Sequence, residues 1–187
     1  MDLSWVPPVA TLVLGIVGTL ILERLRDDRT EMRESMQRRA AREGASRDRR
    51  ERFELDTLQA AYDASNALGR AAFRYHFLDR EVAKKLNVEY ASHQLGSIPG
   101  EAELGESLRL ANLTASSHAS MILDTEIRDQ LRLAVDVTMK VGHGEKTVEE
   151  ADRMMDDAAS FLGAAQEQMA ERIRAIYLET GSTPPAA

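Results

Sequence analysis

The sequence predicts an all-α protein with one N-terminal transmembrane helix, a charged helical neck and an antiparallel bundle of about four helices, the long ones coiled-coil-like. Aromatic residues make up only 5% of the 187 residues, which suits helices packed through Leu, Ala and Met better than sheets. Beyond residue 53, apolar residues recur at every third or fourth position. We therefore expect an anchor at 1–22, a neck at 23–52, a bundle at 53–180 and a flexible tail at 181–187.

The first element is an uncharged run of seventeen residues from Val6 to Leu22, VPPVATLVLGIVGTLIL. As a helix it would be about 26 Å long, near the lower limit for a bilayer core of about 30 Å. Trp5 lies at its outer edge, where an indole favours the membrane interface. The alternatives are a cleavable signal peptide and a buried core helix. Asp2 makes the N-terminus acidic, and the run leads straight into Glu23 with no small-residue cleavage site after it, so an uncleaved signal-anchor is the favoured interpretation.

Charged residues that follow this run predict its orientation. Four arginines lie just beyond it, namely Arg24, Arg26, Arg29 and Arg33, whereas the other end carries only Asp2 and the terminal amine. Positive charge favours the cytoplasmic side. We expect a single-pass protein of the plasma membrane with its N-terminus outside and its body in the cytoplasm. The alternative is an envelope component with the body outside.

Small residues share one face of the predicted anchor. Thr11, Gly15 and Thr19 are four residues apart, with Gly18 beside them. Small side chains in this register let two transmembrane helices approach closely. The face is a candidate site of self-association, although Gly and Thr are also common in membrane helices that do not pair.

The neck, residues 23–52, is weakly basic, and the rest of the chain is acidic. The neck has eleven Arg against eight Asp and Glu, a net charge of +3, and residues 53–187 carry a net −9. Opposite charges four residues apart stabilise an exposed helix. A thin apolar seam in the neck leaves a coiled coil and a single helix both open, and it consists of Leu25, Met32, Met36 and Ala40. The acidic body argues against nucleic-acid binding, which needs a continuous basic face.

Four amphipathic segments make up the body. The first segment reaches about residue 87, and a Gly- and Pro-containing loop separates it from the second. This loop covers residues 92–100. The third segment, at 124–141, has Asp124 as its candidate N-cap. Thr147 and Glu150 form a capping box before the last helix. The residues expected to face inward are Leu58, Ala61, Ser65, Leu68, Ala72, Tyr75, Val82 and Leu86, then Leu104, Leu108, Ala111 and Ala115, then Ile127, Leu131, Ala134 and Val135, and finally Val148, Ala151, Met155, Ala158, Leu162, Ala165, Met169, Ile173 and Ile176.

Three stretches carry a resemblance: WVPPVATLVLGIVGTLI, the neck through RDRRERF, and LQAAYDASNALGRAAFRY on the first body helix. In layout they resemble a widespread group of uncharacterised bacterial proteins, especially from GC-rich genomes. Members of that group combine a short anchor, an Arg-rich neck and a helical body. The resemblance implies that layout and no activity.

Little in the chain points to chemistry. Cysteine is absent, which excludes thiolate metal sites, and Glu89 with His93 alone does not make a metal site. No Gly-rich phosphate loop occurs, so no cofactor or small-molecule substrate is evident. Arg70 and His76 have an Arg-x5-His spacing faintly like the nuclease motif of some small helical domains, although Ala71 replaces the usual polar residue. We expect a membrane-anchored interaction or scaffold module that binds itself or another protein, with a small enzyme or toxin as the alternative.

Overall fold

The structure is a computed structural model that describes the backbone of residues 6–90 and 100–180 and the side chains of residues 32–90 and 100–179. Within these ranges the chain is all-α, as predicted, and its one β-type pairing is an isolated bridge between Tyr90 and Lys146. The four helices are α1 (Val6–Leu86), α2 (Glu101–Met121), α3 (Thr125–Lys140) and α4 (Val148–Thr180). The chain divides into two compact units, Met1–Arg50 and Glu51–Ala187.

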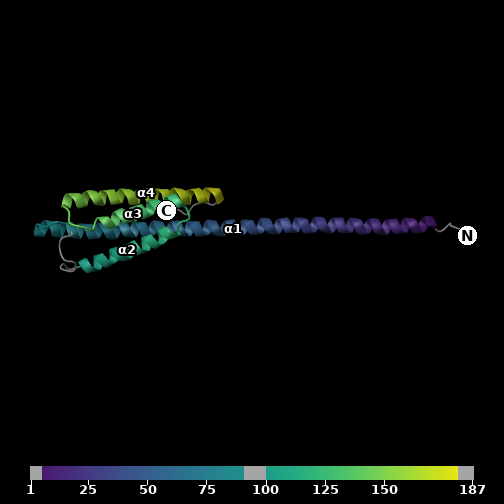
Figure 1. The fold of residues 1–187 in the computed structure, drawn as a ribbon, viewed down its shortest axis with the longest axis horizontal. Helices are drawn as coiled ribbons and strands as arrows, with labels where there is room; N and C mark the ends of the chain where they lie inside the picture. The colour runs from purple at the N-terminus through teal and green to yellow at the C-terminus, as the bar shows by residue number, and fades with distance from the viewer. Residues whose placement is uncertain (1–5, 91–99, 181–187) are drawn as a thin grey trace. The chain divides into compact units, whose positions relative to one another are not determined.

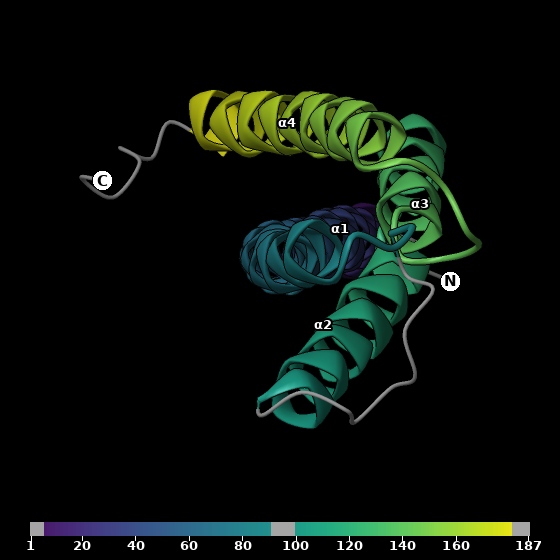
Figure 2. The ribbon, with the colours of Figure 1, turned by 90° about the vertical axis from the view of Figure 1, so that its left-hand side faces the viewer.

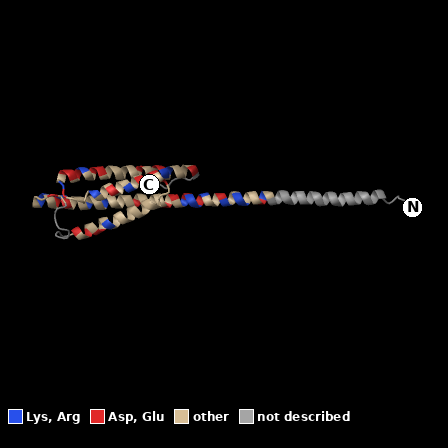
Figure 3. Ribbon diagram, in the orientation of Figure 1, with Lys and Arg blue, Asp and Glu red and all other residues tan. Residues whose placement is uncertain are grey.

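In the first unit, α1 is a helix whose described side chains, from residue 32 to residue 50, are all exposed. Basic and acidic residues are interspersed along it (Figure 3). Glu34 and Arg38 form an ion pair of 2.8 Å, which adds a few tenths of a kcal/mol to an exposed helix. Met32 and Met36 are each 61% exposed. Whether this seam pairs with another chain stays a prediction.

No helix within the described part of the chain combines the length and the apolar content that a membrane span requires. Most residues of the predicted anchor and its flank lie outside the residues whose side chains are described. These are Trp5, Val6 and Leu22, the small-residue face Thr11, Gly15, Gly18 and Thr19, and the flanking Arg24, Arg26 and Arg29. Arg33 is described, and its side chain is exposed.

In the second unit, α1 buries the stripe that the sequence predicts. Leu58, Ala61, Ser65 and Leu68 are at most 1% exposed, and the stripe reaches Val82. The prediction for Leu86 is wrong, since this residue is 60% exposed. His76 of α1 faces Asp152 of α4, and α4 begins only four residues earlier, at Val148. Because the two helices are antiparallel, the last turn of α1, which contains Leu86, extends beyond the start of α4.

Local signals place the ends of α3 and α4 as predicted. The Asp124 carboxylate accepts hydrogen bonds from the backbone N–H groups of Glu126 and Ile127, which caps α3. Thr147 and Glu150 form the reciprocal capping box at α4, with distances of 3.0 and 3.1 Å. The stripe of α4 is buried from Ala151 to Met169. In α2, by contrast, Leu104, Leu108 and Ala111 are only partly buried, and Ala115 and Ala119 are fully buried.

Side-chain contacts show that α1 and α4 run antiparallel. Arg172 Nε donates to Glu54 Oε1 at 2.7 Å, Gln166 Nε2 donates to Ser65 Oγ at 3.0 Å, and His76 Nε2 lies 3.0 Å from Asp152 Oδ1, so the number on α4 falls as the number on α1 rises. One core combines buried residues of all four helices. The body helices lie alongside one another (Figure 1), and in end view α2, α3 and α4 leave one long side of α1 without a neighbouring helix (Figure 2).

Candidate functional site

A buried polar cluster lies where the end of α1 meets the start of α4. His76, 6% exposed, has its Nδ1 3.0 Å from the Tyr90 hydroxyl and its Nε2 3.0 Å from Asp152 Oδ1. The Asp152 carboxylate is an acceptor, so Nε2–H is the donor to it and Nδ1 faces the tyrosine hydroxyl. Arg80 Nε lies 3.4 Å from the other oxygen of Asp152. Both ring nitrogens of His76 are therefore engaged by the protein.

Tyr90 is the most buried member of this cluster, with a relative exposure of 0%. Burial, followed by the charge and hydrogen bond of Asp79 and by the charge of Asp152, raises the pKa of the Tyr90 hydroxyl above its ordinary value of 10.0. An Asp–His–hydroxyl series is the order of groups in hydrolases with a hydroxyl nucleophile. Here the hydroxyl is inaccessible to a substrate and harder to ionise than a free phenol. The arrangement therefore joins helices rather than forming an accessible catalytic site.

The loop before α4 is held by the same cluster. The backbone N–H of Tyr90 donates to the Lys146 carbonyl at 2.9 Å, and the Lys146 ammonium lies 5.7 Å from the centre of the Tyr90 ring. That ammonium also donates to the carbonyls of Val141 and His143 at 2.7 and 2.6 Å, where α3 ends. Partial burial lowers the pKa of Lys146. Lys146 thus joins the end of α3 to Tyr90, which follows α1 in the chain.

Two buried carboxylates lie nearby. Asp79 is 3% exposed and Glu101, the first residue of α2, is 2% exposed. After burial itself, their charges raise the pKa of the half-buried Tyr75. No group of three or more His, Asp or Glu among the described residues is arranged to hold a metal ion.

The surface with the clearest binding character is an apolar groove between the end of α1 and the start of α2. Phe73 and Phe77 lie one turn apart on α1 and are 59% and 53% exposed. The groove has a volume of about 700 Å³. We call it the aromatic groove, and the residues that line it are Phe73, Arg74, Phe77, Leu78, Glu81, Lys85 and Leu104. Adjacent exposed aromatic rings are unusual on a soluble surface and mark interaction sites.

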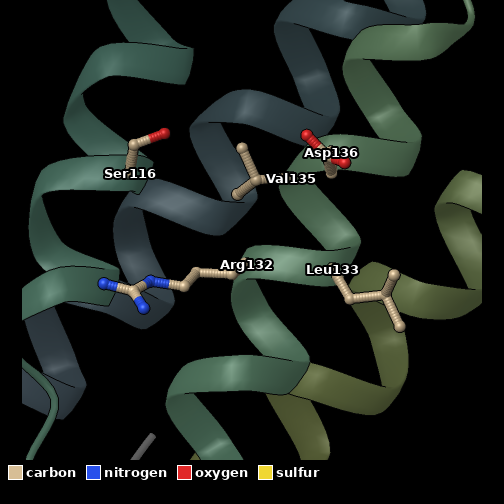
Figure 4. Close-up of a pocket in the computed structure, with 5 residues that line it drawn as sticks. All are labelled: Ser116, Arg132, Leu133, Val135 and Asp136. Atoms are coloured by element: carbon tan, nitrogen blue, oxygen red, sulfur yellow. The ribbon is translucent and has the colours of Figure 1, made fainter.

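A second hollow, between α2 and α3, has a volume of about 500 Å³ (Figure 4). Its lining is Ser116 from α2 and Arg132, Leu133, Val135 and Asp136 from α3. The Ser116 hydroxyl donates to Asn112 Oδ1 at 3.5 Å, and an amide oxygen does not act as a general base. The hollow therefore offers mixed surface but no arrangement of a nucleophile with its base.

The structure does not bring Arg70 and His76 together. Arg70 is exposed, whereas His76 is buried with both nitrogens engaged by Tyr90 and Asp152. Of the Glu89 and His93 pair, His93 lies outside the described residues. The sequence analysis missed the aromatic groove. The signal available was that Phe73 and Phe77, two of only four Phe in the chain, fall off the predicted inward stripe.

The chain matches no protein-family model, no curated protein and no solved structure. The resemblance in layout to a group of bacterial proteins therefore stays a prediction.

Proposed function

We propose that this protein is a membrane-tethered interaction module whose helical body binds another protein through the aromatic groove. The observation that carries the proposal is the exposure of Phe73 and Phe77 beside each other, 59% and 53%, at the rim of a groove of about 700 Å³. Aromatic side chains in a groove are typical anchors of protein interfaces. A scaffold role also agrees with the polar cluster, which joins helices instead of meeting a substrate.

Tethering is the second part of the proposal, and it rests on the sequence. The uncharged residues 6–22, the interfacial Trp5 and the arginines that follow favour a signal-anchor with the body in the cytoplasm. A fluorescent protein fused at the C-terminus should then fluoresce, and an alkaline phosphatase fused there should be inactive. Active phosphatase with a dark fluorescent fusion would reverse the orientation.

Crosslinking in cells tests the binding site directly. A photo-crosslinking phenylalanine analogue replaces Phe77 in one variant and Leu113 in another, since these two side chains are almost equally exposed, 53% and 52%. We expect a protein adduct of one defined mass from position 77 and none from position 113. Absence of any adduct at 77, or the same adducts from both positions, would contradict binding through the groove.

A further inference from the structure

The aromatic groove has a charge opposite to that of the body around it. Residues 53–187 carry a net charge of −9. The charged residues that line the groove are nevertheless Arg74 and Lys85 against Glu81, and Arg70 is exposed one turn before Arg74. Charges at the rim of an interface select partners through complementarity. A partner that fits this rim is acidic.

The spacing of the residues that line the groove suits a helix. Phe73 and Phe77 are four residues apart on α1 and so project from the same face, while Leu104 lines the groove from α2. An amphipathic helix binds such a groove through apolar side chains that recur at three and four residues. Acidic residues that flank those apolar side chains would then lie close to Arg74 and Lys85.

The size of the apolar patch argues against a second copy of this chain as the occupant. A fully buried Phe contributes about 150 to 250 Å² of area, so two rings that are just over half exposed offer on the order of 200 Å². A stable interface between two folded proteins needs about 800 Å² from each partner. A patch of this size suits the few anchoring contacts of one short helix. Among the exposed residues that the structure describes on this chain's own α4, Leu178 is the single large apolar side chain, so that helix offers no row of apolar anchors to the groove of a second copy.

We propose that the aromatic groove binds an acidic amphipathic helix of a partner protein, with apolar side chains against Phe73 and Phe77 and carboxylates against Arg74 and Lys85. This proposal rests on the proposed function and specifies the chemistry of the partner.

Two synthetic helical peptides test it. Both carry Leu at three- and four-residue spacing; one has Glu at the flanking positions and the other has Lys there. Fluorescence anisotropy measures their binding to the full chain in mild detergent. Two ion pairs that change from attraction to repulsion should make the Glu peptide bind about tenfold tighter, and high salt should reduce the difference. Equal affinity of the two peptides, or tighter binding of the Lys peptide, would overturn the proposal.

Matched variants separate the groove from non-specific adsorption to detergent or protein. Phe73→Ser with Phe77→Ser should weaken the Glu peptide at least tenfold, while Leu110→Ser with Leu113→Ser, which removes side chains that are 51% and 52% exposed, should leave it unchanged. All four side chains lie at the surface, and circular dichroism confirms that each variant is folded. Equal loss in both variants would refute the proposal. So would a dimer of the full chain that dissociates only in the Phe73 and Phe77 variant, because the occupant would then be a second copy.

The two proposals fail in distinguishable ways. An adduct at position 77 without a preference for the Glu peptide would leave an interaction module with a different kind of partner. Absence of both the adduct and peptide binding would remove the interaction function as well.

Discussion

Replacing Tyr90 by phenylalanine is expected to lower the free energy of unfolding by about 1 to 3 kcal/mol. The ring stays, so the packing of this fully buried residue and the backbone hydrogen bond from its N–H to Lys146 are kept. The change removes the hydroxyl that lies 3.0 Å from His76 Nδ1. A buried polar group that loses its partner costs about 1 to 3 kcal/mol. His76 loses this partner and keeps its contact with Asp152.

Urea unfolding of the full chain in mild detergent, followed by far-ultraviolet circular dichroism, measures this loss. With a slope of about 1 to 3 kcal/mol per molar urea, the midpoint should fall by roughly 1 M. Tyr62→Phe is the matched control, because this half-buried tyrosine packs against the core and its hydroxyl forms no hydrogen bond in the described structure. We expect the control to change stability by less than about 0.5 kcal/mol. Equal effects of the two substitutions would show that the polar cluster does not stabilise the body.

Three further predictions concern the same body. Folding raises the pKa of Tyr90, so the contribution of this group to the free energy of unfolding should be constant below about pH 10 and fall above it, by up to about 1.4 kcal/mol per pH unit. Urea titrations at stepped pH should show a shallower fall in Tyr90→Phe, and an unchanged slope would contradict the assignment. Arg172→Ala leaves the buried Glu54 carboxylate without its 2.7 Å partner and should cost about 1 to 2 kcal/mol, and a cost near zero would mean that water replaces the arginine. Leu131→Ala, at a fully buried position, should lower the free energy of unfolding by about 3 kcal/mol, measured in urea. Leu133→Ala, at a position that is 45% exposed, should lower it by under about 1 kcal/mol. Similar values for the two would refute the assigned core face of α3.

Much of the helical layout could be predicted because the signals are local. The capping boundaries at Asp124 and Thr147 depend on residues two or three positions away, and the stripe from Ala151 to Met169 depends on helix periodicity alone. The prediction for Leu86 failed for a non-local reason. Periodicity assigns a face to every turn of a helix, but it does not say where the neighbouring helix begins.

The predicted pairing of Arg70 and His76 failed for a non-local reason as well. The sequence identifies Arg70 and His76 as an Arg-x5-His spacing, and the structure separates them, because His76 turns inward to residues that lie 14 and 76 positions away along the chain. Such pairings depend on the register of α1 against α4. Spacing within one helix carries no information about that register.

The sequence by itself determined the helical class, the helix ends with local caps, the inward stripes and the contrast between a basic neck and an acidic body, since each depends on neighbouring residues or on composition. Only the tertiary structure decided which apolar residues stay uncovered. Phe73 and Phe77 are as apolar as many residues of the core, yet the packing of α2, α3 and α4 against α1 leaves them 59% and 53% exposed. The arrangement of whole helices, rather than the hydrophobicity of any one residue, creates the aromatic groove.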